Sequence, residues 1–88
     1  MDKNTAYNLY RKKEEFCQLL RERGFKCKDI KEHIIEIYGQ NNNSLGTIFD
    51  DRILVIDTEW CERYKGDKSY NDDISRLQKL AEDFKIRD

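Results

Sequence analysis

Hydrophobic residues recur at helical spacing in both terminal parts of the chain. Near the N-terminus they predict a helix from about Thr5 to Arg23, ended by Gly24, which suits the left-handed position after a last turn. Near the C-terminus a second stripe predicts a helix over about residues 70–86, with Ser69 and Asp72 at capping-box spacing. The two stripes are Ala6, Leu9, Tyr10, Phe16, Cys17 and Leu20 in the first helix, and Tyr70, Ile74, Leu77, Leu80, Ala81 and Phe84 in the second.

Between these stripes the pattern favours short strands. Residues 53–56 form a run rich in β-branched side chains, and residues 45–49 precede it across a turn at Asp50–Asp51. We therefore expect a hairpin of residues 45–49 with 52–57. The preceding residues, 40–44, have the polar composition of a loop.

The segment His33–Tyr38 fits two interpretations. As a helix it would be capped by Asp29 and ended by Gly39. As a strand it is rich in isoleucine and would pair with residues 45–49 across the polar loop. We favour the strand, because a two-stranded hairpin alone is only marginally stable and a third strand completes a sheet.

The elements together indicate an α+β fold. A short helix over residues 58–65, capped by Asp57 and ended by Gly66, joins the hairpin to the last helix. With 88 residues, the chain can bury about 65% of its surface on folding, enough for one small core. We expect one compact domain over residues 1–88, in which an antiparallel β-meander of two to three strands packs against the N-terminal and C-terminal helices.

Charge is abundant and unevenly distributed. Charged residues make up 40% of the sequence, yet the formal net charge is only −1. Residues 11–31 hold eight basic and four acidic side chains, whereas residues 50–73 hold eight acidic and four basic ones. Such a chain offers two oppositely charged surfaces if the fold keeps these segments apart.

The cysteines and the apolar runs indicate a cytoplasmic protein. Cys17, Cys27 and Cys61 form an odd set without a CxxC pair, which favours reduced thiols, and their spacing to His33 matches no standard zinc finger. The first residues lack the apolar core of a signal peptide, and the longest apolar run is too short to span a membrane. We expect no metal and no cofactor.

A hydrophobic strand ending in Asp57-Thr58-Glu59 resembles the first metal-binding motif of the DnaQ-like 3′–5′ exonucleases. On this resemblance Asp57 and Glu59 would hold two divalent ions that activate water. That family needs further carboxylates well downstream and a larger sheet, whereas only 29 residues follow Glu59. We therefore expect Asp57 to cap a helix.

The sequence also lacks the groups for other catalysis. Its single histidine, His33, lies beside Ile34 without a marked nucleophile, and its four glycines stand alone rather than forming a phosphate loop. We predict that the protein is not an enzyme.

The acidic half of the chain contains the candidate binding site. Its only tryptophan and two tyrosines stand among carboxylates, a composition typical of interface hot spots. A helix over 58–65 would place Trp60 and Tyr64 on one face, although both could instead fill the core. The predicted partner-binding residues are Asp57, Glu59, Trp60, Glu62, Tyr64 and Asp67.

The basic half offers an alternative, nucleic-acid binding through the first helix. Lysines and arginines there would contact phosphates, and neighbouring aromatic residues would stack on bases. Acidic residues on the same helix and a sequence pI of about 5.9 argue against this interpretation. The residues concerned are Arg11, Lys12, Lys13, Arg21, Lys26 and Lys28.

We therefore expect a small non-catalytic cytosolic module that docks its acidic and aromatic patch on a basic surface of another protein. Such a patch can occupy the nucleic-acid groove of an enzyme and inhibit it. In general character the chain is similar to phage- or mobile-element-encoded inhibitors such as the anti-CRISPR proteins. A homodimer sealed by the exposed edge of the meander is a third possibility.

Overall fold

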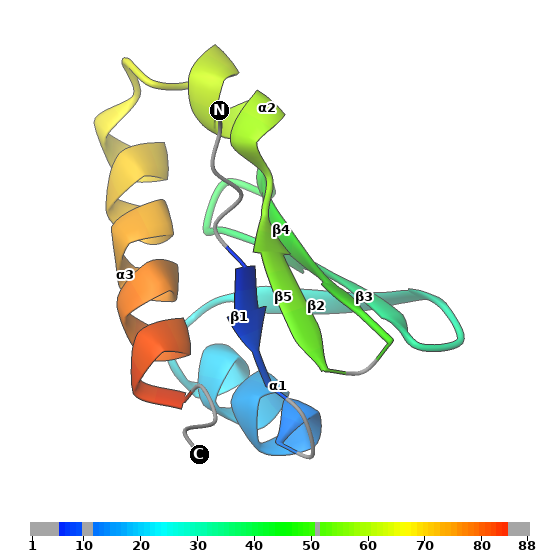
Figure 1. Cartoon of the computed structure of the whole chain (residues 1–88). Helices are drawn as coiled ribbons and strands as arrows, with labels where there is room; N and C mark the ends of the chain where they lie inside the picture. The colour runs from blue at the N-terminus through cyan, green and yellow to red at the C-terminus, as the bar shows by residue number, and fades with distance from the viewer. Residues whose placement is uncertain (1–5, 10–11, 51, 85–88) are drawn as a thin grey trace.

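A computed structural model describes residues 6–9, 12–50 and 52–84 and shows an α+β fold with one antiparallel sheet and three helices (Figure 1). The sheet has five strands in the order β1-β5-β4-β3-β2, so the predicted two to three strands were too few. In chain order the elements are β1 (Ala6–Asn8), α1 (Lys13–Glu22), β2 (Lys26–Lys31), β3 (Ile34–Tyr38), β4 (Ser44–Phe49), β5 (Ile53–Ile56), α2 (Thr58–Arg63) and α3 (Lys68–Phe84).

The central meander is the part that the pattern predicted. Strand β4 pairs with β5 and with β3, so the strand interpretation of the segment before Gly39 is confirmed and the helix is excluded. Asn42, in the polar loop, and Asp50, in the following turn, adopt positive φ angles of 64° and 55°. Asparagine and aspartate tolerate this left-handed conformation better than most residues. Asp51 lies outside the described residues.

Strand β2 was not predicted. It pairs with β3 as an edge strand, and its burial is low everywhere except at half-buried Cys27. Its sequence, Lys-Cys-Lys-Asp-Ile-Lys, therefore lacks the alternation that identifies a strand. The turn into β3 also lacks the glycine that would mark it in the sequence. His33 occupies the left-handed position instead, with a φ angle of 69°.

The N-terminal helix begins later than predicted. Residues 6–8 form strand β1 beside β5, and α1 starts at Lys13. Tyr7 and Leu9 are both buried, and their two-residue spacing fits a strand. The free edge of β5 accepts this pairing, a contact that no local pattern reveals. Thr5, Tyr10 and Arg11 lie outside the described residues.

The C-terminal helix is confirmed over its hydrophobic stripe but starts earlier than predicted. Its first turn is capped by Asp67, whose Oδ1 accepts the backbone N–H of Tyr70 at 3.2 Å. The predicted cap, Ser69, instead lies within the helix and its hydroxyl contacts the side-chain amide of Asn41. Residues 85–86 lie outside the described part of the chain.

The core lies between one face of the sheet and the helices α1 and α3. Alternate residues of the strands point into it, including Tyr7, Ile37 and Leu54, and meet fully buried residues of the helices. Helices α1 and α3 both pack on this face, and in Figure 1 α2 lies at the end of the sheet that is opposite to α1. Within the described ranges no helix is long and apolar enough to cross a membrane.

Candidate functional site

Helix α2 begins directly after β5 and is fixed there by Asp57. The Oδ1 atom of this residue accepts the backbone N–H of Trp60, and its Oδ2 atom accepts the hydroxyl of Ser44, both at 3.2 Å. The predicted cap is therefore confirmed. Both carboxylate oxygens are engaged in holding α2 against β4.

Replacing Asp57 by alanine should lower the free energy of unfolding by about 1–2 kcal/mol, the usual cost of losing such a cap. Chemical denaturation followed by circular dichroism measures this change. Glu59→Ala is the matched control, because Glu59 is exposed and lies in the same first turn. An equal effect of both substitutions would show that the cap contributes nothing beyond general helix propensity.

An aromatic stack connects α2 to α3. The rings of Trp60 and Tyr64 are nearly parallel, at 12°, with centroids 5.2 Å apart, and Tyr64 meets Tyr70 at 5.5 Å. The guanidinium of Arg63 lies 5.5 Å from the Trp60 ring centroid. Trp60 and Tyr64 are half-buried, so each rests on the core with one side and faces solvent with the other.

The structure separates the predicted acidic residues into two groups. Glu59 and Glu62 are exposed on α2, and Glu62 forms a surface ion pair with Lys65 at 3.0 Å. Asp57 and Asp67 are instead half-buried helix caps. The surface that remains available on α2 and its C-cap residue consists of Glu59, Trp60, Glu62 and Tyr64, which we call the α2 surface.

Tyr70 supports this surface from below. The sequence pattern placed it in the stripe of the C-terminal helix and in the acidic stretch, but not among the predicted binding residues. Its hydroxyl donates to the backbone carbonyl of Ser44 at 2.8 Å and lies 3.9 Å from the Sγ of Cys61. Burial raises the pKa of Tyr70 and also that of the Cys61 thiol, so both stay protonated at neutral pH. The site therefore holds a neutral polar contact beneath its aromatic rings.

The predicted nucleic-acid residues do not form one surface. Lys12 and Arg21 are exposed on α1 and Lys13 is half-buried there, whereas Lys26 and Lys28 lie on β2. Helix α1 packs on one face of the sheet, and these two strand lysines point to the other. Arg11 lies outside the described residues.

Cys17 of α1 and Cys27 of β2 form a contact that the spacing did not indicate. A hydrogen bond from the Cys27 thiol lowers the pKa of Cys17 to about 7 against the opposing effect of burial, and Lys13 and Arg21 lower it further. The same bond, together with burial, raises the pKa of Cys27. Both thiols are free, and no cluster of three or more metal-ligating side chains occurs among the described residues.

Comparison with protein families, with curated proteins and with solved structures finds no match for this chain.

Proposed function

We propose that the protein is a non-catalytic protein-binding module that docks the α2 surface on a basic surface of a partner protein. The observation that carries this proposal is the half-exposed stack of Trp60 on Tyr64 at helix α2, which also bears two exposed carboxylates, Glu59 and Glu62. Tryptophan and tyrosine are the residues that most often dominate binding energy at protein interfaces.

The support of the rings favours binding, because it lowers the entropy cost of association. Trp60 rests on Tyr64, which meets the buried Tyr70, and the Asp57 cap fixes the start of the helix. Side chains already held in one orientation lose little freedom when a partner covers them.

The carboxylates determine the kind of partner. Glu59 is exposed, and Glu62 is exposed with only a surface ion pair to Lys65, so both would attract a surface rich in lysine and arginine, with an effect mainly on the association rate. A groove that binds nucleic acid on an enzyme has this character. Occupation of such a groove by the α2 surface would make the protein an inhibitor of that enzyme.

The proposal is tested by affinity capture from nuclease-treated lysate of the source cells, with bound proteins identified by mass spectrometry. The double variant Glu59→Lys/Glu62→Lys should lose the captured protein, and Trp60→Ala should weaken its binding by about 2 kcal/mol. Glu14→Lys/Glu15→Lys is the matched control, because both are exposed carboxylates on α1, at the opposite end of the molecule (Figure 1).

The variants must first be shown to be folded by circular dichroism. Capture that is retained by Glu14→Lys/Glu15→Lys but lost in Glu59→Lys/Glu62→Lys supports docking through α2. Capture that survives Glu59→Lys/Glu62→Lys contradicts it. Capture only without nuclease treatment would instead indicate nucleic acid as the partner.

A further inference from the structure

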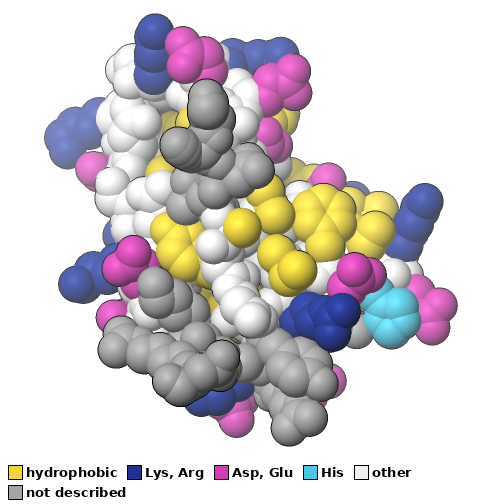
Figure 2. All heavy atoms as spheres, viewed as in Figure 1, with side chains coloured by type: hydrophobic (Ala, Val, Ile, Leu, Met, Phe, Trp, Pro, Cys, Tyr) yellow, Lys and Arg dark blue, Asp and Glu magenta, His cyan; other side chains and the backbone are white. Residues whose placement is uncertain are grey.

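The face of the sheet opposite to α1 and α3 is not covered by any described element. Residues on this face alternate with the core residues, and strand pairing aligns Lys28, Glu36, Thr47 and Val55 in one row. A second row contains Lys31, Ile34, Phe49 and Ile53. Figure 2 shows hydrophobic side chains gathered over β5 and the strands behind it, with charged side chains at their margin. We call this surface the open face.

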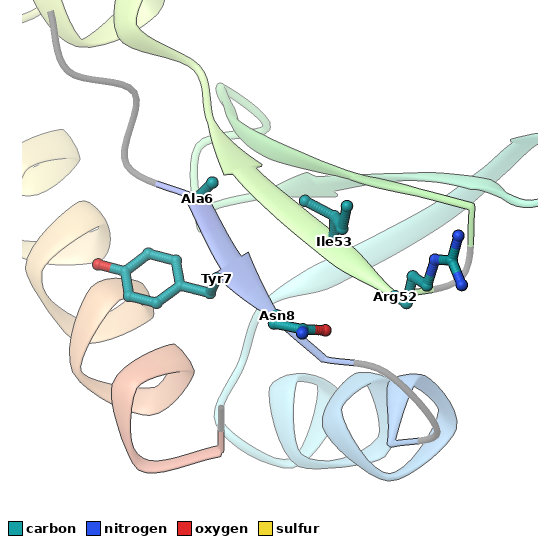
Figure 3. A pocket seen from close by; sticks show the side chains of 5 residues that line it. All are labelled: Ala6, Tyr7, Asn8, Arg52 and Ile53. Atoms are coloured by element: carbon teal, nitrogen blue, oxygen red, sulfur yellow. The ribbon is translucent and has the colours of Figure 1, made fainter. Parts of the chain in front are cut away.

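Aromatic and aliphatic side chains form the centre of the open face. Phe49 is 42% exposed and Ile53 38% exposed, and Tyr38 is half-buried at the other end of β3. In Figure 3 the side chains of Ala6 and Ile53 leave the sheet on the side opposite to Tyr7, which points toward α3. The hollow between β1 and β5 in that view continues the open face to the sheet edge.

Three lysines border this centre along β2. Lys26, Lys28 and Lys31 are exposed, and strand pairing sets them beside Tyr38, Glu36 and Ile34 respectively. Lys26 donates to the Asn42 side chain, whereas neither Lys28 nor Lys31 forms an ion pair with any residue in the described ranges.

One carboxylate stands among the described strand residues of the open face. It belongs to Glu36, and it accepts the hydroxyl of Tyr38. The strands therefore carry three positive side chains and one negative one on this face, and the unpaired ammonium groups lie together on one edge. This charge distribution favours an anionic ligand.

We propose that the open face binds single-stranded nucleic acid, with bases stacked on Phe49 and Tyr38 and phosphates held by Lys28 and Lys31. Exposed rings on a sheet stack with unpaired bases, and an adjacent row of cations follows the backbone of the strand. Stacking on these rings requires bases that are not paired in a duplex, so the ligand is single-stranded. This site is separate from the α2 surface, and each proposal can fail without the other.

The test is fluorescence anisotropy with labelled oligo(dT) and oligo(U) of about 12 nucleotides. This length lies within the range that small domains binding single-stranded nucleic acid cover. Lys28→Glu/Lys31→Glu should weaken binding by about tenfold or more, and Phe49→Ala by about fivefold. Raising the salt concentration should lower affinity with a logarithmic slope of about −0.7 for each phosphate contact.

Lys12→Glu/Arg21→Glu is the matched control, since it makes the same charge change on exposed positions of α1. We expect it to change affinity by less than about twofold, and all variants should keep the wild-type circular dichroism spectrum. Equal loss in both double variants would overturn the proposal, as would absence of binding at low salt. Sedimentation that shows a dimer disrupted by Phe49→Ala would also overturn it, because the open face would then be covered by a second copy.

Discussion

Replacing Tyr70 by alanine is expected to lower the free energy of unfolding by about 3–5 kcal/mol, the range found for large buried side chains. Tyr70 is only 2% exposed, and its ring meets that of Tyr64. Its hydroxyl also donates to the carbonyl of Ser44 and so ties α3 to β4. A domain of this size has a total stability of only about 4–13 kcal/mol, so the variant should be largely unfolded under mild denaturing conditions.

Two measurements separate the contributions of the ring and the hydroxyl. Tyr70→Phe keeps the ring and leaves the Ser44 carbonyl without its donor, so it should lower the free energy of unfolding by about 1–2 kcal/mol. Tyr38→Phe is the control, because the Tyr38 hydroxyl bonds to the half-buried side chain of Glu36. We expect this substitution to lower the free energy of unfolding by about 0.5 kcal/mol or less.

The fluorescence of Trp60 should shift to the red in Tyr70→Ala, since the stack loses its support. Denaturation curves of Tyr70→Ala and wild type that coincide would show that Tyr70 does not anchor α3.

Asp73→Ala is expected to lower the free energy of unfolding by about 2–3 kcal/mol, because several bonds end on one buried carboxylate. Its side chain is 4% exposed and accepts the backbone N–H of Gln40 at 3.0 Å and the guanidinium of Arg76 at 3.1 Å. The Gln40 side-chain amide adds a third bond at 3.2 Å. Asp73 therefore holds the loop between β3 and β4 against α3. Urea denaturation followed by circular dichroism measures the loss.

The neighbouring residue gives the matched control. Asp72 forms only an exposed pair with Lys68, so Asp72→Ala should change the free energy of unfolding by about 0.5 kcal/mol or less. Gly39 provides a second check, because an added Cβ would lie 2.5 Å from the Oδ2 of Asp73. Gly39→Ala should therefore cost less in the Asp73→Ala background than in the wild type. Additive effects would contradict the packing of this loop on Asp73.

The candidate site was only partly accessible from the sequence. The composition around Trp60 indicated an aromatic and acidic surface, and the structure places Trp60 and Tyr64 in one stack. The pattern indicated Asp57 as a cap, yet it also grouped Asp57 and Asp67 with the binding residues, because all are acidic residues near a helix. Only the positions of backbone N–H groups show that Asp67 is a cap as well, while Glu59 and Glu62 face solvent.

Local patterns by themselves determined the α+β class, the β4–β5 hairpin and most of α1 and α3. These elements carry their own signals, such as the stripe along α3 and the β-branched run of β5, since their buried faces follow a regular period. The cap of α2 was equally local, because Asp57 and Trp60 are three residues apart.

The tertiary structure alone decided the two edge strands, the role of Asp73 and the gathering of Lys28, Lys31 and Phe49 on one face. Strand β1 exists because the edge of β5 offers unpaired backbone groups to a segment that lies far from it in sequence. Strand β2 is mostly exposed, so its sequence lacks the alternation of hydrophobic and polar residues that a half-buried strand shows. In both cases the element is defined by a partner distant along the chain, and a pattern of neighbouring residues does not contain that information.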